Sequence, residues 1–415
     1  MQLGKFSFGI GDRFTYQGKA QLRAVMRAIE NGIHVTPVWN KSNREHIYVG
    51  TKPSDTRSEA DEAVKALGYS GSYFVDADHV NLDTVEDYIE VSDFFTLDVA
   101  KYIGQSPSGK EAEAFISSCS KYIGELSIPG IEQPFKIDRP LIWDMTDKFL
   151  FAAKYASEIY SFLKEKKAGK PFITEISFDE VATAQTPIEM FFILKMLADA
   201  GVKMQTIAPK FTGRFNKGVD YLGNIEQFAK EFEQDILVLD YAAKAFGLPK
   251  ELKLSVHSGS DKFSIYPIMA DIIKKYDKGL HIKTAGTTWL EEVIGLAVAG
   301  GDGLELAKEI YEQAYHRIDE LCKPYADVIA VEPAKLPLVT EVRSWDSCKF
   351  ANTLRHIPEH PDYNPNFRQL LHVAYKVAAE MEQRYTGLLV KYSDVIGSCV
   401  EENIYERHLK RLFKL

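Results

Sequence analysis

Ionisable side chains gather where apolar stretches of the sequence end. The stretch that begins at Tyr73 is apolar at first and then closes with Asp76, Asp78 and His79. An unpaired buried charge is costly, so these groups are expected to meet a metal ion or one another at the end of a strand. A strand that stops at a solvated acidic turn is the alternative, because Asp is also a common turn residue.

Two more of these endings carry metal-ligand chemistry. Glu175 lies near the end of the stretch 172–177, and His257 closes the stretch 252–257. Two imidazoles and a carboxylate are a common set for a divalent cation and leave coordination positions open to substrate. We therefore predict His79, Glu175 and His257 as metal ligands, with zinc as the first candidate and nickel, manganese or cobalt as alternatives. A structural histidine is the competing interpretation for each imidazole taken alone.

The pattern of elements indicates how the fold would bring these residues together. Eight apolar stretches of strand length alternate with helical patterns up to about residue 300. They cover 6–10, 35–39, 73–79, 94–98, 172–177, 204–210, 252–257 and 280–284. Such alternation predicts parallel strand–helix–strand units, and eight strands close a (β/α)8 TIM barrel. A doubly wound open sheet is the alternative, but no GxGxxG motif follows the first strand.

Two segments depart from this alternation. Residues from about 100 to 170 hold two helical patterns and a proline-rich link, which we interpret as an enlarged fourth strand-to-helix connection. Residues 301–415 are mostly helical, with a short β-like piece at 328–331. We predict a barrel domain at 1–300 and a helical extension packed on it at 301–415. A helix at 82–91 is expected to precede the fourth strand.

The composition is that of an ordinary globular protein and argues against several classes of function. The 415 residues are 45% hydrophobic and 26% charged, with a net charge of −9 and no basic stripe, so nucleic-acid binding is not expected. No apolar run is long enough for a membrane span, and the N-terminus lacks the apolar core of a signal peptide. The four cysteines form no CxxC pair, which favours reduced thiols and a cytoplasmic location. A homo-oligomer is compatible with this sequence.

Functional groups of a (β/α)8 barrel lie at the carboxyl ends of its strands, and here that rim is crowded with polar residues. The density of ionisable groups indicates a small polar substrate. The Gly/Ser-rich turn Val256–Lys262 could hold an anion on its backbone N–H groups; a turn that caps the next helix is the alternative. His281 begins the eighth strand, at the end away from this chemistry, and is expected to be structural.

Two of these segments resemble the class II metal-dependent aldolases. Those barrels carry an Asp-His pair on the third strand, matched by Asp78 and His79, in which the Asp is catalytic and the His binds the metal. They carry another ligand histidine in a His-Gly-x-Ser turn, matched by His257 and the residues after it. This chain departs at Glu175, where those enzymes have a histidine ligand, and at Ser258, where glycine is usual.

Four segments, spread over nearly the whole chain, resemble the tagaturonate epimerase family. They are Phe8–Arg13 (FGIGDR), Asp76–His79 (DADH), Gly213–Tyr221 (GRFNKGVDY) and Tyr363–Leu370 (YNPNFRQL). The resemblance implies that the chain interconverts D-tagaturonate and D-fructuronate with a divalent metal. It also implies weak activity on the neutral ketohexoses tagatose and fructose.

This reaction implies roles for the rim residues. The inverted carbon lies β to the ketone, so its C–H is not acidic, and cleavage and re-formation of the neighbouring carbon–carbon bond is the expected route. Asp78 is the expected acid/base. A second proton carrier is expected because the hydroxyl points to opposite sides in the two epimers; Asp179 or Glu180 could supply it, as could a tyrosine or water. The predicted substrate-binding residues are Arg13, Lys210, Arg214, Ser258, Ser260, Lys262 and Lys283.

Two other functions compete with this one. A class II aldolase would share the metal chemistry but release its fragments. A sugar-binding barrel without turnover would share the pocket, but a binder needs fewer titratable groups than this rim carries.

Overall fold

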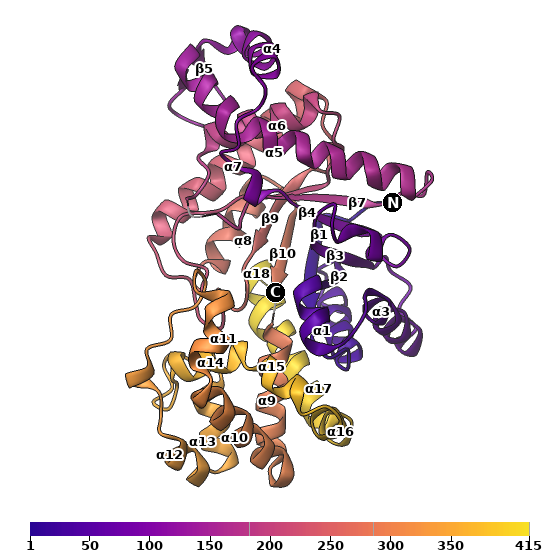
Figure 1. The fold of residues 1–415 in the computed structure, drawn as a ribbon, viewed down its shortest axis with the longest axis vertical. Helices are drawn as coiled ribbons and strands as arrows, with labels where there is room; N and C mark the ends of the chain where they lie inside the picture. The colour runs from indigo at the N-terminus through magenta and orange to yellow at the C-terminus, as the bar shows by residue number, and fades with distance from the viewer. Residues whose placement is uncertain (182, 285, 415) are drawn as a thin grey trace.

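Parallel strands form the centre of the molecule, in a computed structural model that describes residues 1–181, 183–284 and 286–414 (Figure 1). The barrel strands are β1 (Phe6–Gly11), β2 (Val35–Ser42), β3 (Phe74–Val80), β4 (Phe94–Asp98), β7 (Ile173–Ser177), β8 (Thr206–Ala208), β9 (Lys253–His257) and β10 (Leu280–Thr284). They close a barrel in the order β1-β10-β9-β8-β7-β4-β3-β2. The (β/α)8 barrel predicted from the sequence is therefore confirmed.

Helices cover the outside of the barrel. They are α1 (Gly18–Glu30), α2 (Asn43–Val49), α3 (Pro53–Leu67), α6 (Pro187–Asp199), α7 (Ile225–Phe246), α8 (Tyr266–Lys275) and α9 (Thr287–Ala299). Local sequence sets their ends. A capping box of Thr186 and Glu189 starts α6, and Gly247 ends α7 in the left-handed conformation.

The helix predicted at 82–91 is wrong, because only a 3-10 turn, η1 (Val85–Tyr88), forms there. The residues before it explain the difference. The Asn81 side chain accepts a hydrogen bond from the Asp83 N–H at 2.9 Å, and Thr84 Oγ1 accepts one from the Asn81 N–H at 3.2 Å. Such side-chain-to-backbone bonds compete with helix formation, and too few residues remain before β4.

The segment between β4 and β7 is long, although these two strands are neighbours in the barrel. It contains η2 (Ala100–Tyr102), α4 (Gly109–Cys119), η3 (Ser120–Tyr122), the antiparallel pair β5 (Gly124–Leu126) and β6 (Phe135–Ile137), and α5 (Arg139–Lys166). Both predicted helical patterns are present, whereas the small hairpin was not predicted. Figure 1 shows α4 and β5 at one end of the long axis of the molecule.

The chain after α9 is helical, as predicted; most of it lies at the other end of the long axis, whereas α18 (Lys410–Phe413) and the C-terminus lie beside the barrel (Figure 1). Its elements are α10 (Gly301–His316), α11 (Ile318–Cys322), η4 (Lys323–Tyr325), η5 (Pro333–Lys335), α12 (Val339–Ser344), α13 (Ser347–Leu354), α14 (Pro365–Val373), α15 (Tyr375–Glu380), α16 (Gln383–Lys391), α17 (Ser393–Glu402), the π-helix η6 (Asn403–Leu409) and α18 (Lys410–Phe413). Here α17 packs against α9 and α1. The division of the chain into domains near residue 300 stays a prediction.

The piece at 328–331, predicted to be β-like, forms no strand within the described chain. The Val328 carbonyl instead accepts a hydrogen bond from the Lys217 N–H at 2.8 Å, which joins the extension to a barrel loop. Across the described ranges, no helix combines the length and the apolar character that a membrane crossing requires.

The barrel interior has an apolar floor and a polar upper layer. The floor is a cluster of Leu3, Val38, Phe74, Phe94 and Ile173. Because side chains alternate along a strand, the residues two positions after these strand residues also point inward. In β3, β4 and β7 those next positions are Asp76, Thr96 and Glu175. In each of these three neighbouring strands, one inward-facing residue is therefore apolar and the next inward-facing residue is polar.

Candidate metal and catalytic site

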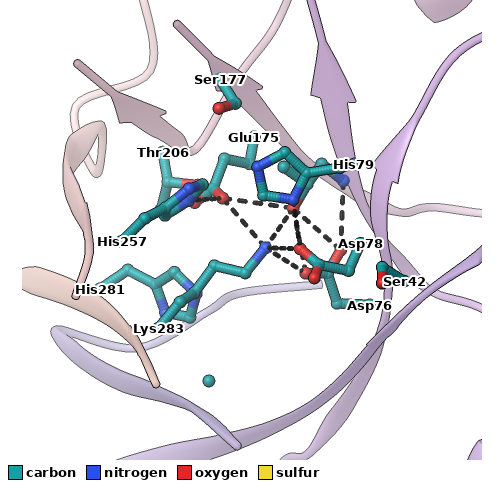
Figure 2. A network of polar contacts seen from close by, with 12 residues as sticks. Ser42, Asp76, Asp78, His79, Glu175, Ser177, Thr206, His257, His281 and Lys283 are labelled. Atoms are coloured by element: carbon teal, nitrogen blue, oxygen red, sulfur yellow. Dashed lines mark hydrogen bonds and ion pairs between the residues drawn. The ribbon is translucent and has the colours of Figure 1, made fainter. Parts of the chain in front are cut away.

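The Lys283 ammonium group lies at the centre of the polar layer, among carboxylates from β3 and β7 (Figure 2). Its Nζ donates to Asp76 Oδ2 at 2.7 Å and to Asp78 Oδ1 at 2.6 Å. Glu175 Oε1 lies 3.4 Å away, and Thr96 Oγ1 lies 2.8 Å away. Burial opposes the charged form, but the three carboxylates raise the pKa of Lys283 well above its ordinary value. Lys283 therefore stays charged and neutralises part of the carboxylate charge.

Gly9 provides the space for this lysine. It is the partner of Lys283 across the β1–β10 pair. A Cβ at residue 9 would lie 2.8 Å from Lys283 Cγ and 2.8 Å from Asn40 Nδ2. These separations are well inside normal van der Waals contact, so a side chain at residue 9 would displace the ammonium group from the carboxylates.

His79 reaches the same centre because β3 is irregular at its carboxyl end. On a regular strand, Asp78 and His79 would point to opposite faces. The register of β3 on β4 shifts between Ala77 and Val80, and His79 has a left-handed φ of 55°. This conformation is rare for a residue other than glycine and is common at functional sites. It allows His79 Nδ1 to lie 2.8 Å from Asp78 Oδ1.

His257, the last residue of β9, approaches from the other side (Figure 2). Its Nε2 lies 2.8 Å from Glu175 Oε1, and its Nδ1 lies 3.0 Å from Asp179 Oδ2. The other oxygen of Asp179 lies 3.5 Å from His79 Nε2. The ring centroids of His79 and His257 are 5.1 Å apart. Asp179 thus stands between the two imidazoles.

These three side chains fit a divalent cation. One ligand atom from each of His79, Asp179 and His257 can be chosen so that all three lie within 4.8 Å of one another. Burial alone would lower the pKa of His257, but Asp179 and Glu175 raise it to about 9, so the pocket attracts positive charge. Each imidazole also contacts a second carboxylate, Asp78 or Glu175, as metal-binding histidines usually do.

This group differs from the predicted ligand set in its carboxylate. Glu175 lies deeper, where its oxygens accept hydrogen bonds from Thr206 at 2.7 Å and Thr96 at 3.2 Å. Burial would raise the pKa of Glu175, but Lys283 and His257 hold it well below its ordinary value. Asp179, which the sequence predicted as a candidate proton carrier, faces both imidazoles. The two carboxylates flank the end of β7, and spacing alone could not rank them as ligands.

The sequence profile of the tagaturonate epimerase family matches residues 1–412. The chain belongs to this family. The tagaturonate/fructuronate epimerase of Thermotoga maritima is 29% identical to it over 423 residues, which cover 98% of this chain and 80% of that protein. The resemblance inferred from the four sequence segments is confirmed, and the chain is an enzyme of an isomerase family.

Solved structures agree with this family assignment. A glycerol complex of fructuronate-tagaturonate epimerase UxaE from Cohnella laeviribosi has a TM-score of 0.82 at 23% identity, and the match covers 99% of this chain and 82% of that one. A probable tagatose 6-phosphate kinase from Sinorhizobium meliloti matches with a TM-score of 0.50 at 10% identity, over 98% and 100% of the two chains. At these identities the structural matches establish the fold alone.

In this member of the tagaturonate epimerase family, three predicted substrate-binding side chains of the turn after β9 are bonded to protein groups, while anion binding by the backbone N–H groups of the turn stays a prediction. Ser258 Oγ donates to a β10 carbonyl at 2.9 Å, and Ser260 Oγ accepts from the Gly218 N–H at 2.9 Å. Lys262 Nζ donates to two carbonyls of the loop between β8 and α7, at 2.9 and 2.8 Å. Burial lowers the pKa of Lys262 to about 7. These side chains join two rim loops, and their role in substrate binding stays a prediction.

Asp261, in the same turn, is the centre of a second buried charged network. Its Oδ2 accepts from Arg368 at 2.7 Å and lies 3.2 Å from His356 Nδ1, while its Oδ1 lies 3.0 Å from His408 Nε2. Burial would raise the pKa of Asp261, but Arg368 and the two histidines hold it well below its ordinary value. All three partners belong to the helical extension, so this network fastens the extension to the barrel.

Three further predicted substrate-binding residues have different surroundings. Arg13 is buried, with its Nε 3.0 Å from Glu45 Oε1 and its guanidinium carbon 3.8 Å from the ring centroid of Tyr375. Lys210 is half-buried, and its N–H is bonded to a side chain of the β7–α6 loop. Arg214 is exposed, and its backbone pairs within its own loop. Of the three, only Arg13 is buried among other rim residues.

Proposed function

We propose that this chain interconverts D-tagaturonate and D-fructuronate with a divalent metal, zinc being the first candidate, bound by His79, Asp179 and His257. Membership of the tagaturonate epimerase family supports the reaction. The observation that carries the metal assignment is the convergence of two imidazoles on Asp179. The second ring nitrogen of each imidazole contacts another carboxylate, Asp78 or Glu175. In this proposal Asp78 and Glu175 orient the imidazoles. Tagatose and fructose, which lack the carboxylate, are poorer substrates.

The chemistry of the substrate favours carbon–carbon cleavage over direct proton removal. The carbon to be inverted is β both to the ketone and to the carboxylate, so no carbonyl group acidifies its C–H. In the proposed route, a base removes the proton of the hydroxyl on that carbon. The bond to the carbon next to the ketone then breaks, and its electron pair passes to the ketone side. When bound, the metal supplies Lewis-acid stabilisation of that negative charge.

The residues of the chain supply the proton transfers in this proposal. Asp78 Oδ1 is bonded to Lys283 and His79, whereas no partner for Oδ2 is found among the described residues. Burial would raise the pKa of Asp78, but Lys283 and His79 lower it, so the carboxylate is ionised and can act as the base. After the aldehyde fragment rotates, the proton returns to its oxygen on the opposite side. Glu180, exposed beside Asp179, is the second carrier that this geometry requires.

Product analysis tests the reaction. The purified protein, stripped with a chelator and then reloaded with one divalent metal at a time, is incubated with either uronate and followed by chromatography. We expect metal-dependent formation of the other epimer and no free three-carbon products. Accumulation of three-carbon fragments would identify an aldolase instead. No conversion with any of the metals would refute the proposed function.

An isotope experiment tests the route. With deuterium in place of hydrogen on the inverted carbon, we expect full retention of the label in the product, because that C–H bond is never broken. Loss of the label to water would replace the cleavage route with direct proton removal.

The Asp78→Asn variant tests the base. With metal in excess and the site filled, as checked by elemental analysis, we expect turnover lowered by about 100-fold or more, in the range typical of a lost acid/base group. Near-native turnover would remove Asp78 from the mechanism.

A further inference from the structure

Two cations at the rim of the barrel lie over one tyrosine ring. The guanidinium carbon of Arg44 is 5.5 Å from the ring centroid of Tyr325, and Lys217 Nζ is 5.6 Å from the same centroid. Arg44 lies in α2, directly after β2, and Lys217 lies in the loop between β8 and α7. Tyr325 belongs to the helical extension. Three segments far apart in the sequence therefore meet at one point of the rim.

A second tyrosine extends this cluster towards β1. The hydroxyl groups of Tyr325 and Tyr375 are 2.7 Å apart, and Tyr375 packs against the Arg13 guanidinium group. Tyr375 is fully buried and Tyr325 is nearly so, so the pair forms a rigid support. Lys217 is fixed as well, because its N–H is bonded to the Val328 carbonyl. The Lys217 backbone and the aromatic support under both cations are thus held in place before any ligand arrives.

Ion pairs compensate only part of the positive charge of this cluster. Arg13 is paired with Glu45 at 3.0 Å. By contrast, neither Arg44 nor Lys217 forms an ion pair with any residue that the structure describes. Burial lowers the pKa of Lys217, and Arg13 lowers it further, while Glu45 and Glu180 oppose the shift. Arg44 is exposed and Lys217 is half-buried, so an anion from solution can reach both.

Glu180 connects this cluster to the candidate metal site. Its negative charge contributes an upward shift to the pKa of Arg44, of Lys217 and of His79. Glu180 directly follows Asp179, the carboxylate between the two imidazoles. A ketohexuronate carries its ketone near one end of its carbon chain and its carboxylate at the other. A substrate whose ketone end lies at His79 and His257 needs a cationic site at some distance along the same rim.

We propose that Arg44 and Lys217, supported by Tyr325 and Tyr375, bind the carboxylate of the sugar acid and set the preference for uronates over neutral ketoses. This inference rests on the function proposed above. Lys262 and Lys283 were predicted from the sequence to bind substrate, but the ammonium group of Lys262 is bonded to protein carbonyls and that of Lys283 to protein carboxylates. An arginine also offers the two parallel N–H donors that match a carboxylate. Arg44 carried no signal of its own in the sequence, while Lys217 lies in one of the four family-like segments.

The variants Arg44→Gln and Lys217→Gln test this site, and Lys217→Arg is the conservative rescue. For each glutamine variant we expect the KM for D-fructuronate to rise by about 10-fold or more, as is typical when a charged hydrogen bond is lost. The kcat should change much less, and Lys217→Arg should restore most of the KM. Metal content should equal that of the wild type. Lys244→Gln, which removes a cation from the last turn of α7, is the matched control and should leave KM unchanged.

The outcomes separate this inference from the proposed function. A wild-type protein that does not convert either uronate refutes the proposed function itself. An active wild type with unchanged KM in both glutamine variants refutes only the carboxylate site. Equal losses in kcat and in metal content would show that Arg44 and Lys217 support the fold around the metal, and would also overturn the inference. Circular dichroism spectra and melting temperatures identify any variant that fails to fold, in which case Lys217→Arg decides.

Discussion

The barrel rim carries two buried charged networks that look alike in composition but differ in charge balance. The network around Lys283 has carboxylates at Asp76, Asp78 and Glu175, with Asp179 beyond them. The network around Asp261 has one carboxylate for Arg368 and two histidines. In the first network negative groups outnumber the fixed cation. In the second, both carboxylate oxygens are fully occupied by donors.

This difference distinguishes a functional site from a structural contact between the extension and the barrel. A buried ion pair whose partners are all satisfied has little left to offer a ligand, and removing one partner leaves a costly buried charge. A buried cluster with surplus negative charge needs protons or a cation, and here two imidazoles face the surplus. We infer that the Lys283 network serves chemistry and that the Asp261 network holds the extension on the barrel. Three predictions can break or sharpen this contrast, and a fourth tests an exposed charge outside both networks.

The largest effect is expected for a substitution in the Lys283 network. His257→Ala removes one of the two converging imidazoles and should abolish stoichiometric metal binding, measured by elemental analysis of the purified protein. Activity should fall by more than about 100-fold, since changes even to residues behind metal ligands typically cost about 10–100-fold. Glu175→Gln, which keeps the size of the side chain behind His257, should lower metal affinity less. Unchanged metal content in His257→Ala would rule out the ligand assignment.

On the other side, Asp261→Ala should affect stability and leave the metal in place. It leaves the Arg368 guanidinium, which is fully buried, without its counter-charge. Breaking a buried pair in this way typically costs about 3–5 kcal/mol, so the midpoint of urea unfolding should fall strongly. Metal content and turnover per folded molecule should stay near those of the wild type. A variant with native stability but no metal would reverse the roles assigned to the two networks.

The histidines of the two networks should respond to pH with opposite signs in metal-free protein. Asp179 and Glu175 overcome the effect of burial and raise the pKa of His257 to about 9. The stabilisation of the folded state by protonated His257 is therefore complete below about pH 6.5 and is lost as the pH rises towards 9. For His408, burial outweighs Asp261 and lowers the pKa. It therefore favours unfolding as the pH falls below about 6.5, because the unfolded chain takes up a proton that the folded one resists.

Urea unfolding at several pH values measures this contrast. Each group contributes a slope of up to about 1.4 kcal/mol per pH unit to the free energy of unfolding. His257→Gln should reduce the dependence on the alkaline side, to which His79 also contributes, and His408→Gln should reduce the dependence on the acid side, to which His356 also contributes. The same sign of change in both variants would contradict the contrast between the networks.

The sequence predicted the barrel well because eight strands each leave a local signal. Apolar runs such as 94–98 and 280–284 form strands, and all eight predicted strands are present. The helix at 82–91 failed because side chains of Asn81 and Thr84 bond to nearby backbone and outweigh an apolar pattern. The hairpin of β5 and β6 is too short to leave a periodic signal.

The site was only partly predictable, for a geometric reason. His79 and His257 could be chosen because the ends of parallel strands share one rim. The choice between Glu175 and Asp179 depends on depth, which spacing does not encode. That Asp78 and His79 face the same centre depends on the left-handed φ at His79, and strand alternation argues against it. Arg44 and Lys217 come together only through Tyr325, from a region more than 100 residues further along the chain.

The smallest effect on KM and stability is expected for a substitution of Arg214. This substitution tests whether any positive charge at the rim contributes to substrate binding. The sequence placed this arginine in a family-like segment and predicted that it binds substrate. In the structure it is exposed, and among the described residues it has no ion pair. Exposed substitutions away from special features usually change stability by less than about 0.5 kcal/mol. We therefore expect Arg214→Gln to keep the wild-type KM and melting temperature, while Lys217→Gln, three residues away, raises KM. A higher KM in Arg214→Gln would mean that the loop between β8 and α7 moves onto the substrate, and that the carboxylate site is wider than Arg44 and Lys217.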